Sequence, residues 1–144
     1  MRVVCQRVSQ AKVSVLNNVV GQINQGFLLY IGFHINDDQE IVKKMADKIV
    51  KLRIFEDENG KLNLNLGQVN GQILAVSQFT LYGNVIGNNR PSFIEACRPD
   101  KAIQLYEMFV MLLKEKFHVE TGVFQAHMLV ESINDGPVTI LIEY

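Results

Sequence analysis

The chain has 144 residues, a formal net charge of −1 at pH 7 and 48% hydrophobic residues. This length predicts one domain, spanning residues 1–144, with enough chain to bury a proper core. The composition excludes collagen-like, disulfide-rich and intrinsically disordered proteins. The near-neutral charge argues against a protein that binds long DNA, because such binding needs many Lys and Arg contacts to phosphates. A local basic patch for a short or shaped RNA stays open.

The cysteines and the first residues predict the compartment. Cys5 and Cys97 lie in apolar surroundings without the spacing of a metal site, which is typical of reduced, buried thiols. The first seven residues become polar too soon for a signal peptide, and no apolar run approaches the 18 residues of a membrane span. We therefore expect a cytoplasmic protein that does not associate with membranes.

The first third of the chain is predicted to form β-strands. Residues 3–8 are rich in β-branched side chains, and residues 12–15 alternate with period two. Two asparagines separate that segment from residues 19–23, which is a hairpin signal. Residues 27–33 are a continuous apolar run, as expected for a strand that is buried on both faces.

Two helices are predicted in the rest of the chain. The first is predicted to begin at Asp37 and Glu40, which have the spacing of a capping box. The second begins near Pro99, a residue that suits the first turn of a helix. The residues predicted to face the core are Ile41, Met45, Ile49 and Leu52 in the first helix, and Ile103, Tyr106, Val110, Leu113 and Phe117 in the second.

Further strands are predicted around and after these helices. Residues 53–55 and 62–66 flank an Asn-Gly turn, and residues 73–81 form another apolar strand before a loop. Alternation resumes at residues 124–130, and a strong turn signal, Asn-Asp-Gly-Pro, precedes a last strand at residues 138–142.

The order of elements predicts the fold class. Strands outnumber helices, and only two helices are present to cover the sheet. This favours a layered α/β fold with the helices on one face, in which mixed β-sheets form a partly closed, barrel-like core. A doubly wound sheet would need more helices.

Common catalytic motifs are missing. The chain has no phosphate-binding glycine loop and no GxSxG nucleophile elbow. His34, His118 and His127 are scattered without metal-ligand spacing, so we expect no metal and no cofactor. His127 alternates onto the polar side of its predicted strand, where solvation is the simpler interpretation.

Charged runs have ordinary interpretations. Residues 56–58 are acidic and precede a turn, which favours a solvated loop over a pair of catalytic carboxylates. The lysines of the first helix are interpreted first as its solvated side, and a phosphate-binding face is the alternative. They are Lys43, Lys44, Lys48 and Lys51.

Two segments are unusual. Ser77, Gln78 and Thr80 place three polar side chains near the end of an apolar strand, where sites are often built. Hydrogen bonds from Ser77 and Thr80 to neighbouring backbone are the simpler interpretation. Gly136-Pro137 lies in a tight turn and permits a cis peptide, although few X–Pro bonds are cis and an ordinary hairpin turn is the simpler interpretation.

Five strings carry a resemblance to a known family. They are the opening Met-Arg-Val-Val with Gln-Arg-Val, residues 48–57, Ser-Gln-Phe-Thr-Leu-Tyr at 77–82, Asn-Arg-Pro-Ser-Phe at 89–93 and Asn-Asp-Gly-Pro-Val-Thr at 134–139. In this order, they make the chain resemble the D-aminoacyl-tRNA deacylase family over essentially its whole length. The resemblance implies hydrolysis of the ester that joins a D-amino acid, or glycine, to the 3′-terminal adenosine of tRNA, while L-aminoacyl-tRNA is spared.

The resemblance also implies how the site is assembled. We expect a homodimer with active sites at the subunit interface. Gly136-Pro137 is expected to be cis and to enter the partner's site, where its carbonyl oxygens face the substrate's Cα and leave no room for an L side chain. Such a filter excludes the wrong enantiomer by a clash and cannot exclude glycine.

Roles for individual residues follow from the resemblance. Backbone N–H groups around Phe79 and Thr80 are expected to bind the ester carbonyl oxygen, and the tRNA's own 2′-OH to assist the attacking water. We favour Thr80 as a positioning residue over a nucleophile, since no neighbouring base is predictable. Gln78 is expected to hold the adenosine or the ester, and Arg7 to orient the Gly-Pro loop, with a surface charge as the alternative. Met128 is expected to line the pocket or pack in the core.

The chain departs from the family pattern at two places. Residues 83–88 lack the basic side chains usual in the family, and Gln125 stands where glycine is common.

Two other functions are alternatives to the deacylase. The main alternative is a tRNA-binding editing-type module without catalysis, and a small-molecule esterase is a third hypothesis. Activity that depends on the tRNA end would distinguish the deacylase from both.

Overall fold

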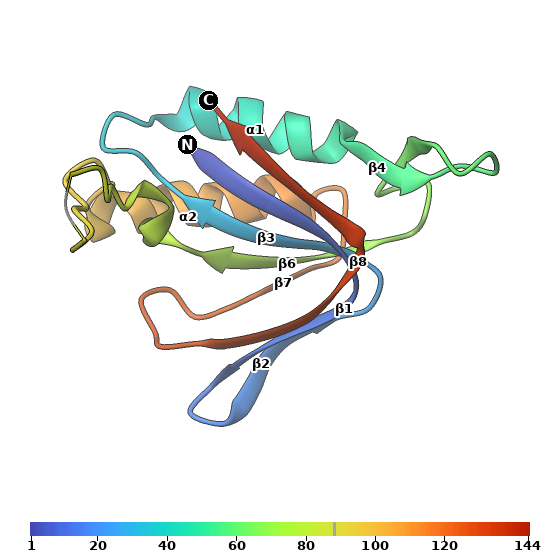
Figure 1. Cartoon of the computed structure of the whole chain (residues 1–144), viewed down its shortest axis with the longest axis horizontal. Helices are drawn as coiled ribbons and strands as arrows, with labels where there is room; N and C mark the ends of the chain where they lie inside the picture. Colours follow the sequence, from blue (N-terminus) through green and yellow to red (C-terminus); the bar gives the residue numbers. More distant parts are fainter. Residues whose placement is uncertain (88) are drawn as a thin grey trace.

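The computed structural model describes residues 1–87 and 89–144 (Figure 1). Its elements, in order, are β1 (Arg2–Val15), β2 (Asn18–Ile23), β3 (Gly26–Gly32), α1 (Gln39–Lys51), β4 (Arg53–Glu56), β5 (Leu62–Asn65), β6 (Gln72–Ser77), the 3-10 turn η1 (Phe79–Tyr82), α2 (Pro99–Lys114), β7 (Val119–Thr121) and β8 (Leu129–Glu143). None of the described helices is long and apolar enough to cross a membrane.

The main sheet is organised around the long strand β1. One edge of β1 pairs antiparallel with β3 over residues 2–8 and with β2 over residues 11–15. β8 runs antiparallel along its other edge, while β6 and β7 extend the sheet in parallel beyond β3. Because the two halves of β1 have different partners, β2 and part of β8 curl away from the rest of the sheet (Figure 1). The predicted mixed, partly closed and barrel-like arrangement of strands is confirmed.

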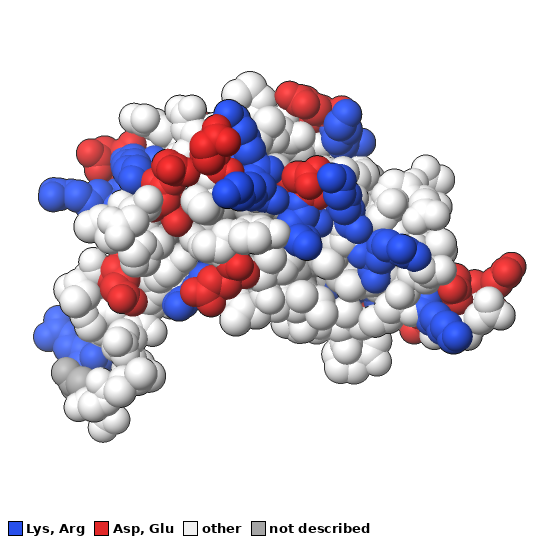
Figure 2. Space-filling model, turned by 90° about the horizontal axis from the view of Figure 1, so that it is seen from above, with Lys and Arg blue, Asp and Glu red and all other residues white. Residues whose placement is uncertain are grey.

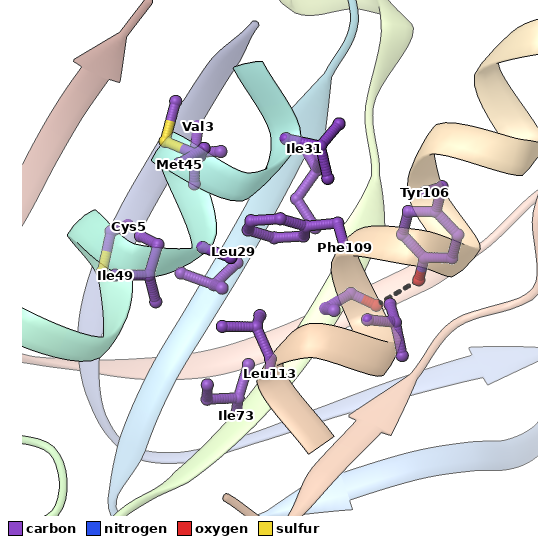
Figure 3. Packing of buried hydrophobic residues seen from close by; sticks show 14 of the residues in the cluster. Val3, Cys5, Leu29, Ile31, Met45, Ile49, Ile73, Tyr106, Phe109 and Leu113 are labelled. Atoms are coloured by element: carbon purple, nitrogen blue, oxygen red, sulfur yellow. Dashed lines mark hydrogen bonds between the residues drawn. The ribbon is translucent and has the colours of Figure 1, made fainter. Parts of the chain in front are cut away.

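The larger part of the core lies between the sheet and the two helices. Phe27, Leu29 and Ile31 on β3 face α1 and α2, which share one side of the sheet. Figure 3 shows Met45 and Ile49 of α1 and Phe109 and Leu113 of α2 packed against these strands. On the other side of the sheet, Leu28 of β3 and Leu74 and Val76 of β6 form a second cluster with residues of β1 and β2. This two-sided burial confirms the interpretation of residues 27–33.

Polar groups inside the core have partners. The Tyr106 hydroxyl donates to the Ala75 carbonyl oxygen at 2.9 Å. The ammonium group of Met1 is buried and donates to Asp37 Oδ1 at 2.8 Å, and the other carboxylate oxygen accepts from the His34 N–H at 2.7 Å. Asp37 therefore ties the first strand to the loop before α1.

The predicted cap of α1 is wrong by one residue. The helix is capped by Asp38, whose side chain accepts from the Ile41 N–H at 3.0 Å. Asp37 was the expected cap, but its carboxylate is engaged by the buried ammonium of Met1 instead. For the carboxylate of Asp37, the ion pair with the ammonium therefore replaces the hydrogen bond that would cap the helix.

Three predicted strand boundaries are also corrected. β6 ends at Ser77, where the chain turns into η1 instead of continuing as a strand to residue 81. Residues 122–128 are not a strand, because the chain bends there and Gln125 has a φ of 61°. Asn-Asp-Gly-Pro at 134–137 does not connect two strands but lies within the single strand β8.

Replacement of Asp37 tests the buried ion pair. Asp37→Ala leaves the ammonium of Met1 buried without its carboxylate, so we expect a loss of about 3 kcal/mol in the free energy of unfolding. Asp38→Ala removes only a cap and should cost about 1 kcal/mol. Urea unfolding of both variants makes the comparison, and equal costs would contradict the assignment.

Candidate active site

A cleft of about 680 Å³ opens where β3 and β6 end. Its walls come from the ends of these strands, the segment before α2, the first residues of α2 and residues 124–128. Ser77, Gln78 and Phe79 line it, as does Met128. The structure therefore brings three of the predicted catalytic residues together with Met128, and Thr80 follows directly in η1.

The backbone turn after Ser77 leaves hydrogen-bond donors unused. The Gln78 N–H still donates to the Ile31 carbonyl oxygen at 2.7 Å, as in a parallel sheet. The chain then enters η1, and the first N–H groups of a helical turn have no partner inside it. No described residue accepts a hydrogen bond from the N–H of Phe79 or of Thr80, and both residues are exposed.

The side chain of Thr80 is not arranged as a nucleophile. Its hydroxyl oxygen accepts a hydrogen bond from the side-chain amide of Gln78. The hydrogen bond of Thr80 to neighbouring backbone, which the sequence suggested, is therefore replaced by one to a side chain. Among the described residues, no histidine bonds to this hydroxyl, and a hydroxyl without a base is a weak nucleophile.

The segment 89–93 contributes Phe93 to the wall of the cleft. Ser92 and Asn84 exchange two backbone hydrogen bonds, each of 2.8 Å. This holds the Phe93 ring edge-on to the Phe79 ring, with 5.0 Å between the ring centroids. The Phe79 side chain is thereby positioned, although 58% of its surface is exposed.

Gly136-Pro137 forms a bulge in β8. The pairing with β1 moves from Val8–Asn134 to Gln6–Thr139, so four β8 residues lie opposite Arg7 alone. The Gly136-Pro137 peptide bond is cis, as the resemblance implied. The side chain of Asn134 spans the bulge, because it accepts from the Val138 N–H at 3.1 Å and donates to Thr139 Oγ1 at 3.0 Å.

Arg7 fixes the base of this bulge. Its guanidinium is buried and donates to the carbonyl oxygens of Asp135 and Ile54, both at 3.0 Å. The carboxylates of Glu56 and Asp135 lie at 3.6 and 3.4 Å. A Cβ on Gly136, whose φ is 125°, would lie 2.9 Å from Arg7 Nη2, so the bulge needs glycine there. The alternative of a surface charge for Arg7 is wrong.

The two unusual segments do not meet within one chain. Arg7 pairs with Phe27, whereas Ser77 pairs with Ile31, four residues further along β3. Three strand spacings also separate β8 from β6. At about 3.3 Å per residue and 4.8 Å per strand, the bulge and the end of β6 lie roughly 20 Å apart.

Sequence reasoning missed part of the cleft wall. Arg98, Phe124 and His127 line the cleft, although no motif marks them. His127 is exposed, as its interpretation as a solvated residue predicts. Cys97 also lines it, and burial raises the pKa of this thiol, which makes it a poor nucleophile near neutral pH. No three metal-ligating side chains cluster within residues 1–87 and 89–144. That no metal is required stays a prediction.

Known proteins resemble this chain in sequence over its whole length. Residues 4–143 match the family described as D-Tyr-tRNA(Tyr) deacylase. The chain belongs to this deacylase family. Proteins named D-aminoacyl-tRNA deacylase share 57% identity in Lactobacillus gasseri, over 99% of both chains, and 55% in Thermotoga petrophila, over 99% of this chain and 97% of the relative. Membership confirms the predicted family and the prediction of a hydrolase.

Solved structures share the fold of this chain. A protein named c-Myc DNA unwinding element binding protein superposes with a TM-score of 0.94 at 36% identity, covering 100% of this chain and 99% of the other. A probable eukaryotic D-amino acid tRNA deacylase superposes with a TM-score of 0.84, over 98% and 97% of the two chains. The second, at 19% identity, shows the fold alone.

The backbone at Gln125 adopts a conformation that suits the glycine which the resemblance led us to expect there. A φ of 61° is strained for a side chain such as glutamine. Gln125→Gly should therefore raise the free energy of unfolding by about 1 kcal/mol. Gln125→Ala keeps the strain and should give no such gain. Denaturant titration measures both, and a gain from alanine as large as that from glycine would contradict the explanation.

Proposed function

We propose that this chain hydrolyses D-aminoacyl-tRNA, and mischarged glycyl-tRNA, to the free amino acid and tRNA. The observation that carries the proposal is the pair of N–H groups of Phe79 and Thr80 beside an open cleft, in a chain that belongs to the deacylase family. A protein that acts on aminoacyl-tRNA would be located in the cytoplasm, where translation takes place.

The proposed chemistry needs little from the side chains. Water attacks the ester carbonyl carbon, and negative charge develops on the carbonyl oxygen. Two backbone donors fixed at the start of η1 can stabilise that charge without reorganisation, and one such donor is typically worth about 3–4 kcal/mol. The 2′-OH of the terminal adenosine would assist the water. Gln78 and Thr80 bond to one another, which supports positioning roles for both.

The proposed selectivity comes from the Gly136-Pro137 bulge. Its backbone would stand against the substrate's Cα, so that an L side chain would collide with carbonyl oxygens while a D side chain points away. Glycine has no side chain and would pass. The hold of Arg7 on the Asp135 carbonyl, with the bridging Asn134 side chain, supports the rigidity that such a wall needs.

The proposal requires two copies of the chain. The bulge lies too far from the Ser77 end of β6 to complete the same chain's cleft, so it would complete the cleft of a partner subunit. The long strand β8 supports this, because it pairs only with β1 among the described strands. It also exposes apolar side chains along its length, namely Leu129, Ile133 and Leu141. Such an edge favours association.

Hydrolysis of paired esters tests the function. Purified protein, with a chelator present, should rapidly deacylate D-Tyr-tRNA and glycyl-tRNA and leave L-Tyr-tRNA intact. A D-ester with a 2′-deoxy terminal adenosine should be resistant. Loss of both enantiomers would indicate a general esterase, and loss of neither would indicate a tRNA-binding module without catalysis.

Proline at position 79 tests the backbone donors. Phe79→Pro removes one N–H at a position where the first turn of a helix accepts proline. It should lower kcat about a hundredfold or more relative to Phe79→Ala, which loses the ring but keeps the donor. Thr80→Ala should retain activity within about tenfold. A loss beyond about a thousandfold in Thr80→Ala, near 4 kcal/mol, would instead favour a nucleophile.

A further inference from the structure

A basic surface runs over the C-terminal half of α1 and the start of β4. It consists of Lys44, Lys48, Lys51 and Arg53, all of them exposed. Figure 2, which looks down on α1, shows Lys and Arg side chains gathered over this part of the molecule. The three lysines follow one another at helical intervals of four and three residues, so they form one stripe.

The charges of this surface are only partly neutralised. Lys51 pairs with Asp47 at 2.7 Å, but within the described residues Lys44 and Lys48 have no acidic partner. Arg53 donates to the backbone and side-chain oxygens of Asn63, and its charge is partly offset by the nearby carboxylate of Asp57. Elsewhere on the helix, Lys43 is paired with Glu40 at 2.7 Å. The surface therefore keeps a local positive excess in a chain of net charge −1.

The basic surface lies beside the Gly136 bulge and far from the chain's own cleft. Arg53 precedes Ile54, whose carbonyl oxygen accepts from the same Arg7 that holds the Gly136 bulge. The surface is thus adjacent to the bulge. It is remote from the chain's own cleft, because α1 begins after the cleft end of β3 and its 13 residues carry the chain about 20 Å back.

The chemistry of the partner follows from charge and spacing. Lys44 to Lys51 spans about 10 Å along the helix axis, which matches two or three successive phosphates of a nucleic-acid strand. The loop at residues 83–87 offers no basic side chain beside the cleft. An aminoacyl-tRNA whose 3′ end lies in a cleft must place its acceptor stem on some nearby surface, and this one is positive.

We propose that Lys44, Lys48, Lys51 and Arg53 bind the phosphate backbone of the tRNA acceptor stem. This inference rests on the proposed function and deepens it. The stem would lie on the subunit that supplies the Gly136-Pro137 bulge, while the aminoacyl end enters the cleft of the other subunit. Each dimer would then hold a tRNA across both chains.

A double charge reversal tests the surface. Lys44→Glu with Lys48→Glu should raise KM for D-Tyr-tRNA about tenfold or more, and should leave hydrolysis of D-tyrosyl-adenosine, which lacks the stem, unchanged. The dependence of log(kcat/KM) on log salt concentration should become shallower by about two. The matched control, Lys114→Glu with Lys116→Glu, makes the same charge change at the end of α2 and should behave as wild type.

Binding of uncharged tRNA, followed by fluorescence anisotropy, gives a readout that needs no hydrolysis. The α1 variant should bind about tenfold more weakly than wild type and control. Equal binding by all three proteins would overturn the inference, as would a similar loss in the control or an equal loss on D-tyrosyl-adenosine. A wild-type protein that binds tRNA through these lysines but cleaves neither ester would overturn the proposed function and leave the surface standing.

Discussion

The buried guanidinium of Arg7 is the contact on which the arrangement of the bulge depends. A charge inside a sheet is costly unless it is well hydrogen-bonded. Here it donates to two backbone carbonyl oxygens, one on β4 and one at the start of the Gly136 bulge, with two carboxylates nearby. The same side chain leaves no room for a Cβ at position 136. One residue of β1 therefore joins the small β4–β5 hairpin to the bulge and holds the backbone of the bulge in place.

The proposed site is built mainly from backbone, which explains why its chemistry leaves few marks in the sequence. The donors of Phe79 and Thr80 are free because β6 gives way to a helical turn, and any residues that allow this turn would present the same groups. Selectivity is assigned to carbonyl oxygens of the bulge. A search for triads, paired carboxylates or metal ligands therefore finds nothing, although the proposed reaction is a hydrolysis.

Much of the fold could be predicted from local patterns. The two-sided burial of residues 27–33 and the stripes of both helices depend on periodicity, which is a local property. The errors have non-local causes. Asp37 lost its capping role to the ammonium of Met1, and Asn-Asp-Gly-Pro became a bulge because β1 continues past it and supplies Arg7. Neither partner is visible from a window of neighbouring residues.

The candidate site shows the same division. Ser77, Gln78 and Phe79 could be placed at the end of a strand, and the resemblance to the family singled out Gly136-Pro137. The contribution of Arg98, Phe124 and His127 to the cleft could not be predicted, since it arises where α2 and residues 124–128 meet the strand ends. The left-handed backbone of Gln125 likewise depends on that bend.

The central claim is that one subunit's bulge completes the other subunit's cleft. Mixed dimers, purified through a different affinity tag on each chain, test it most directly. One chain carries Phe79→Pro, which disables its own cleft, and the other carries Gly136→Ala. The only working cleft of the mixed dimer therefore belongs to the Gly136→Ala chain. If the bulge acts across the interface, that cleft meets an intact Gly136, and the mixed dimer should hydrolyse D-Tyr-tRNA with wild-type selectivity over L-Tyr-tRNA. A mixed dimer that behaves like the Gly136→Ala homodimer would contradict the account.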